Sequence, residues 1–152
     1  MSRTAFAVLT LLMCASGALA QNVVRGNPKG LMQPLNGSYS QVVRAGNLLF
    51  IAGQTGLKED GKVVNGGMKE QAEQAYANVL IALKSQGADF SHVVRVTTYV
   101  TSVEEYRQSG VGEVRNKYAG SATPASTLLQ VAALAYPELK IEIEVTAVLP
   151  RE

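Results

Sequence analysis

The chain contains no tryptophan, one cysteine and one histidine. One cysteine excludes an internal disulfide framework, and one Cys with one His cannot supply the ligands of an ordinary zinc site. The chain also has no large excess of charge of either sign, because its 14 Lys and Arg nearly balance its 12 Asp and Glu and leave a formal net charge of +2. Nucleic-acid binding through phosphate contacts is therefore not expected. Neither a GxGxxG fingerprint nor a P-loop occurs, since Gly61-Lys62 is followed by Val63.

Long apolar runs are missing too, apart from a short one near the N-terminus. Arg3 precedes the apolar stretch 5–13, and small residues then lead to Ala18-Leu19-Ala20. A basic start, a short apolar core and an A-x-A ending are typical of a secretory signal peptide. We expect cleavage before Gln21; a buried N-terminal helix or a lipoprotein site at Cys14 are the weaker alternatives.

The remaining chain has the length of one ordinary domain and no internal repeat. We expect residues 1–20 to be a signal peptide and residues 21–152 to form one domain. The predicted location is periplasmic or secreted, without membrane contact after cleavage.

Alternating strands and helices are predicted for the mature domain, after an irregular lead-in over residues 21–38. Strands are expected at 41–44, 48–52, 62–64, 93–101, 126–133 and 139–149, and helices from 68 to about 86 and from 102 to about 118. The order β-β-β-α-β-α-β-β predicts an α+β fold with two helices packed on one mixed sheet.

Local signals support the two helices. Apolar residues recur at helical spacing from Met68 to Leu83, and Gly87 is a typical left-handed terminator. Ser102 and Glu105 fit the capping box S-x-x-E at the start of the second helix. Gly110 lies inside that second span and is expected to weaken or bend it.

The two C-terminal strands differ in their patterns. The strand 139–149 alternates strictly, whereas both faces of 126–133 are largely apolar. Two helices can cover only one face of the sheet, so another copy of the chain is the simplest cover for the other. We therefore predict a homo-oligomer.

Few residues are candidates for chemistry. Glu142 and Glu144 project from one strand face and suit acid–base work, although a solvated strand face explains them as well. His92 lies in a loop, where a histidine is usually solvated. The free backbone N–H groups of Gly66-Gly67 are suited to binding an anion, although a simple turn explains the pair as well. Tyr39 is placed to contact a ligand from a loop or to pack.

Together, several segments resemble the YjgF/RidA family. The resemblance rests on G-S-Y-S-Q at 37–41, L-F-I-A-G-Q at 49–54, V-R-V-T-T-Y-V at 94–100, P-A-S-T at 124–127 and K-I-E-I-E-V-T-A at 140–147. It implies a chorismate-mutase-like fold and a homotrimer with ligand clefts between subunits. Active members hydrolyse 2-imino acids and their enamine tautomers to 2-oxo acids and ammonia without a cofactor.

The resemblance also implies roles for five positions. Glu142 corresponds to the residue that positions the attacking water, and Tyr39 to a tyrosine on a flexible loop. The arginine that binds the substrate carboxylate is replaced by Ser126. The serine of the usual S-G-Q segment is Ala52, and an asparagine of the second helix is Gly112.

Replacing a guanidinium by a hydroxyl removes two parallel charged hydrogen bonds to a carboxylate. We therefore expect a protein that binds a small molecule and associates with further copies of itself. We expect no metal and impaired deamination. The alternative is an active cofactor-free deaminase in which another group holds the substrate. A purely structural or protein-binding trimer is a third possibility.

Overall fold

The computed structural model describes residues 22–150. The signal peptide predicted for 1–20 and the cleavage at Gln21 lie outside the described residues. Within 22–150, no helix combines the length and the apolar character needed to cross a bilayer.

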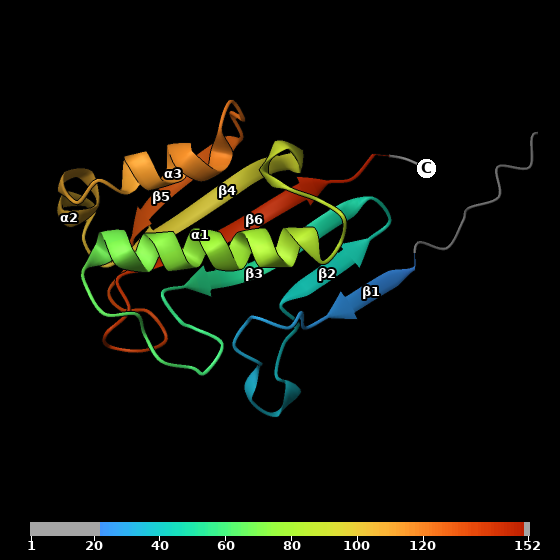
Figure 1. The fold of residues 1–152 in the computed structure, drawn as a ribbon, viewed down its shortest axis with the longest axis horizontal. Coiled ribbons are helices and arrows are strands. Elements are labelled where there is room, and N and C mark those ends of the chain that lie inside the picture. Colours follow the sequence, from blue (N-terminus) through green and yellow to red (C-terminus); the bar gives the residue numbers. More distant parts are fainter. Residues whose placement is uncertain (1–21, 151–152) are drawn as a thin grey trace, which may run out of the picture.

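One mixed sheet carries three helices (Figure 1). The strands lie in the order β1-β2-β3-β6-β4-β5, and only the β4–β5 pair is parallel. The strands are β1 (Val23–Gly26), β2 (Val42–Ala45), β3 (Leu48–Thr55), β4 (Val93–Val100), β5 (Ala125–Gln130) and β6 (Ile141–Val148), and the helices are α1 (Met68–Lys84), α2 (Val103–Gln108) and α3 (Val111–Ala119). Two short 3-10 turns, Leu35–Gly37 and Phe90–His92, complete the elements. The predicted α+β fold on one mixed sheet is confirmed.

The core lies between α1 and the centre of the sheet. Helix α1 crosses β3 and β6, and α3 lies beside it towards β5 (Figure 1). The apolar set of the last strand is buried as its alternation predicted, from Leu139 through Ile143 to Leu149. The stripe of α1 is buried against it, with Met68, Val79 and Leu83 at most 1% exposed.

Three turn predictions are confirmed. Gly46 adopts a φ of 61° in the β2–β3 hairpin, and Gly87 adopts 71° just after α1. Ser102 Oγ accepts a hydrogen bond from the Glu105 backbone N–H at 3.1 Å, so the N-cap of α2 forms. The Glu105 side chain binds Lys140 Nζ, at 2.8 Å and 2.9 Å, and does not reach back to the cap.

Other predictions of elements were wrong. The lead-in 21–38 contains strand β1, whose valines Val23 and Val24 pair antiparallel with β2. The predicted strand 62–64 does not form, because a tight turn around Gly61 leaves only one bridge, between Leu57 and Val63.

The second helix and the fifth strand also differ from their predicted ranges. The helix predicted over 102–118 is divided into α2 and α3, because Gly110 takes a left-handed φ of 81° that ends the first segment. Strand β5 ends at Gln130, three residues before its predicted end at 133.

Candidate functional site

A cavity of about 380 Å³ lies where β3 and β6 meet at an irregular point of the sheet. The register between these strands shifts between Ile51 and Gln54, which is the signature of a β-bulge. Bulges re-aim side chains at sheet edges and near sites. Ala52, Gly53 and Gln54 at this bulge therefore line the cavity together with Glu142 and Tyr39.

Glu142 supplies the only carboxylate among the residues that line this cavity in the described part of the chain. Burial, and then the charge of Glu144, raise the pKa of its carboxyl. The carboxylate makes no hydrogen bond or ion pair with any residue in 22–150, so its oxygens are free for a ligand or a water. A half-buried, unpartnered carboxylate of this kind suits a general base.

Gly53 allows this placement of the carboxylate. A Cβ at position 53 would overlap the carboxylate of Glu142. Any side chain at position 53 would therefore displace the carboxylate from the bulge.

Tyr39 lies close to the same carboxylate. Its side chain is 43% exposed, on the segment that follows the first 3-10 turn. Partial burial raises the pKa of its hydroxyl, and the charge of Glu142 and the neighbouring Tyr136 act in the same direction. Tyr39 and Tyr136 are both partly exposed residues that line the cavity.

Buried amides form the polar wall of the cavity. Gln54 Nε2 donates to Gln41 Oε1 at 2.6 Å, and Gln41 Nε2 donates to the Met32 carbonyl at 2.7 Å. Asn78, from α1, donates to the carbonyls of Thr55 and Leu57 at 3.2 Å and 2.8 Å. These bonds fix the loops on either side of the bulge.

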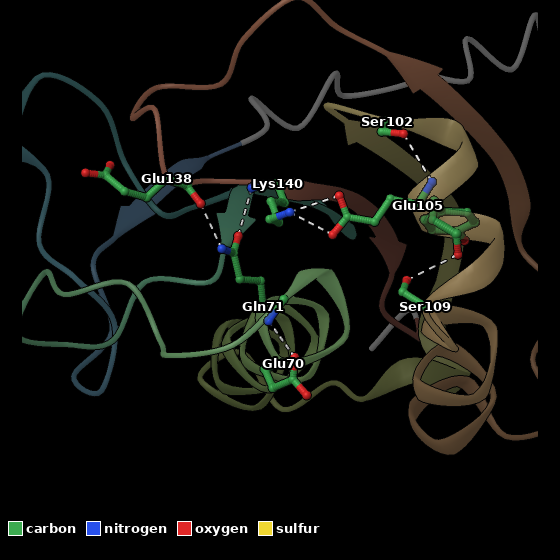
Figure 2. Close-up of polar contacts among 9 residues, drawn as sticks. Glu70, Gln71, Ser102, Glu105, Ser109, Glu138 and Lys140 are labelled. Atoms are coloured by element: carbon green, nitrogen blue, oxygen red, sulfur yellow. Dashed lines mark hydrogen bonds and ion pairs between the residues drawn. The ribbon is translucent and has the colours of Figure 1, made fainter.

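Gln71 holds the loop that supplies Tyr136 and Leu139 to the cavity. Its Nε2 donates to the Glu138 carbonyl at 2.8 Å, and its Oε1 accepts from the Lys140 backbone N–H at 2.8 Å. Figure 2 shows this amide between the two backbone groups, beside the Lys140–Glu105 ion pair. The side chain is 2% exposed, so both hydrogen bonds are shielded from water.

Ser126 lies elsewhere in the chain. It pairs in register with Val96, which faces α1 and α3, whereas Glu142 alternates with the buried Ile141 and Ile143. The side chains of Ser126 and Glu142 therefore leave opposite faces of the sheet. Ser126 lines a second cavity, of about 280 Å³, under α3.

Gly112 is exposed on α3 and lines neither cavity. The structure thus brings together Tyr39, Ala52 and Glu142, and separates Ser126 and Gly112 from them within one chain.

The remaining candidates have local structural explanations. Glu144 is exposed. His92 Nδ1 contacts Asp89 Oδ1 at 3.1 Å within a 3-10 turn. The Gly67 N–H donates to Glu70 Oε2 at 2.7 Å, so the chain's own carboxylate occupies the backbone donor there. Within 22–150, no three His, Cys, Asp or Glu side chains gather as metal ligands would.

Comparison with known proteins supplies the family. The family model described as Endoribonuclease L-PSP matches residues 32–149. The chain belongs to the YjgF/RidA family. Reactive Intermediate Deaminase A from Arabidopsis thaliana is 40% identical over 74% of this chain, which spans 59% of that relative's length.

Two further relatives extend the match. The 2-iminobutanoate/2-iminopropanoate deaminase of Homo sapiens is 37% identical over 74% of this chain and 80% of its own length. The crystal structure of a putative endoribonuclease from Thermotoga maritima is 32% identical, with a TM-score of 0.75 over 84% of this chain and 98% of that chain.

Sequence reasoning missed several residues that line the Glu142 cavity or, like Gln71, hold a loop beside it. Gln71 and Asn78 are polar residues inside a helix, and their spacing among the apolar positions of α1 was the only available signal. Gln54 and Gly53 lie within the recognised L-F-I-A-G-Q segment, but the bulge that turns them into the cavity was not predicted.

Proposed function

We propose that residues 21–152 form an exported homotrimer whose subunit clefts bind a small molecule, and that this protein hydrolyses 2-imino acids poorly. The proposal joins family membership to the A-x-A ending at Ala18-Leu19-Ala20 and to the replacement of the expected arginine by Ser126.

The composition of the Glu142 cavity carries the functional part of the proposal. In the described chain, no arginine or lysine is among its lining residues, which include Glu142, Tyr39 and Tyr136. A 2-imino acid carries a carboxylate, and Glu142 would repel that carboxylate unless a cation offset it. In the proposed trimer, Ser126 of the partner subunit would stand at this cleft in place of the arginine. Charged hydrogen bonds contribute roughly 1.5–3 kcal/mol each, so losing a bidentate pair weakens substrate binding by about 10²–10⁴-fold. The cavity therefore favours a neutral or cationic ligand.

An uncovered sheet face supports the trimer. All three helices contact one another and pack on one side of the sheet, and Leu48, Phe50 and Leu129 remain 38%, 45% and 42% exposed. Leu48 pairs with Val148 and Phe50 pairs with Thr146 across β3 and β6. All four side chains lie on the sheet face away from the core. Exposed apolar side chains gathered on one face favour association with another copy. Analytical ultracentrifugation should give three times the mass of residues 21–152; a monomeric mass would contradict this part.

Imine hydrolysis should be measured directly. 2-Iminopropanoate is generated in situ, purified residues 21–152 are added, and semicarbazone formation is followed. We expect a rate close to the uncatalysed background, with Glu142→Ala indistinguishable from the unchanged protein. Turnover well above background that Glu142→Ala abolishes would contradict the proposal.

An active deaminase is the second candidate. The free, half-buried carboxylate of Glu142 beside Tyr39 favours it, as do the deaminase names of relatives that are 37–40% identical. In that case a group from outside the Glu142 cavity of the same chain must hold the substrate carboxylate. The two candidates differ in the outcome of the Glu142→Ala assay.

A further inference from the structure

The second cavity combines an apolar floor with an uncompensated guanidinium. Its volume is about 280 Å³, and it lies between α3 and strands β4 and β5. The floor is formed by buried side chains that are at most 7% exposed, namely Tyr76, Phe90, Val93 and Val96. The rim is polar and exposed, with Arg115 and Asn116 from α3 and Ser126 from β5.

Arg115 has no acidic partner within residues 22–150. Its one polar contact is from Nη2 to Asn116 Oδ1, at 3.2 Å. The glutamates of the adjoining helix surface are already paired, Glu113 with Lys69 at 3.0 Å and Glu73 with Lys117 at 2.9 Å. The positive charge of Arg115 at this rim is therefore not balanced by a neighbouring carboxylate.

The floor also holds a polar group without a partner. Tyr76 is 2% exposed, stacks on Tyr118 with ring centroids 5.5 Å apart and lies 5.9 Å from Phe90. Its hydroxyl makes no hydrogen bond with any residue of the described chain, and it is not fully enclosed, because Thr97 Oγ1 is the one enclosed side-chain polar atom without a partner among residues 22–150. Burial raises the pKa of this hydroxyl, the neighbouring Tyr106 acts in the same direction, and the positive charge of Arg115 acts in the opposite one. The Tyr76 hydroxyl is therefore available to a ligand in the cavity that its side chain lines.

We propose that this cavity binds a small monocarboxylate with an apolar or aromatic body, through the guanidinium of Arg115. The planar fork of the guanidinium matches a carboxylate, with bidentate hydrogen bonds that a lysine cannot reproduce. Ser126 and the Tyr76 hydroxyl are further donors, and the apolar floor takes the body of the ligand. One guanidinium over an apolar floor suits a single negative charge better than a phosphate.

This site shares Ser126 with the proposed function but does not rest on it. The two cavities have no lining residue in common, and the cavity of Arg115 is formed within one chain. Loss of 2-imino-acid turnover through Ser126 and binding of a carboxylate through Arg115 can each hold without the other.

Phenylacetate and benzoate are suitable probes, and calorimetric titration of purified residues 21–152 measures their binding. We expect saturable binding of at least one probe at millimolar concentration or below. Arg115→Gln should weaken it by about 10–100-fold, because it removes charged hydrogen bonds. The affinity of Arg115→Lys should lie between those of the unchanged protein and Arg115→Gln. Tyr76→Phe should weaken binding several-fold.

Matched controls locate the site. Arg107→Gln removes an exposed arginine of α2 that does not line the cavity, and it should leave the affinity unchanged. Glu142→Gln should also have no effect, because Glu142 belongs to the other cavity. Phenylacetamide, which has the same body without the charge, should bind at least tenfold more weakly than phenylacetate.

Three results would overturn the proposal: no saturable binding of either probe by the folded protein, binding that is insensitive to Arg115→Gln, or binding that Glu142→Gln removes. Competition by equimolar inorganic phosphate would assign the rim to phosphate and would overturn it as well.

Discussion

Replacing Gln71 should loosen the loop that closes the Glu142 cavity. Truncation to alanine removes both 2.8 Å hydrogen bonds of this buried amide and leaves the Glu138 carbonyl and the Lys140 N–H without partners. Each unsatisfied buried group costs about 1–3 kcal/mol. Because Glu138 is exposed and water can reach part of the loop, we expect the free energy of unfolding to fall by about 2–4 kcal/mol.

Urea denaturation followed by circular dichroism measures this loss, and two further variants separate its causes. Gln71→Met keeps the side-chain volume against Gly56 and should still lose most of the stability, because the backbone partners stay unsatisfied. Gln108→Ala removes an exposed amide of α2 and should change stability by less than about 0.5 kcal/mol. Amide hydrogen exchange should accelerate at Lys140 in both Gln71 variants. Unchanged stability and unchanged exchange in Gln71→Ala would refute the role given to this amide.

Three further outcomes test other parts of the account. Gly110→Ala should destabilise the fold by about 1–2 kcal/mol, because residue 110 has a left-handed backbone. Gly112→Ala should stabilise the fold by up to about 1 kcal/mol, because residue 112 lies inside α3 with open space around a Cβ. Equal effects of the two variants in thermal unfolding would contradict this. Burial and the charge of Glu144 raise the pKa of Glu142 in the folded protein. The contribution of Glu142 to the free energy of unfolding is therefore fully present below the unfolded pKa of about 4.3 and is lost as the pH rises through the folded pKa. Glu142→Gln should therefore gain stability relative to wild type on going from pH 4 towards neutral, and a constant difference in urea midpoints would count against the shift. Mass spectrometry of exported protein should find Gln21 as the first residue, and a retained Met1 would exclude cleavage.

Periodic patterns predicted the fold where burial repeats with the geometry of an element. The alternation through Ile141 and Ile143 specified the buried face of β6, and the stripe of α1 specified its packing. Features that depend on one backbone angle or on distant partners were not predictable in this way. The left-handed Gly110 divides the helical span that begins at the Ser102 N-cap, and the bulge at Ala52 and Gly53 appears only once β3 pairs with β6.

The site shows the same division. The resemblance placed Glu142, Tyr39 and Ala52 in a common role, and these residues line one cavity. Sequence alone did not indicate that Ser126 leaves the opposite face of the sheet, because that depends on the register with β4. The proximity of Arg115 to Ser126 was likewise unpredictable, since it requires α3 to return over the edge strand.

The most direct test of the account compares imine hydrolysis by Ser126→Arg and Thr127→Arg. Both residues are exposed on β5, and each variant adds one arginine at neighbouring positions. Their side chains leave opposite faces of the sheet, so Thr127→Arg controls for the added charge alone. The account predicts that Ser126→Arg raises turnover of 2-iminopropanoate by about 10²–10⁴-fold over wild type, while Thr127→Arg stays at the background rate. Efficient turnover by the wild type, with no gain in Ser126→Arg, would contradict the claim that the missing arginine limits this chemistry.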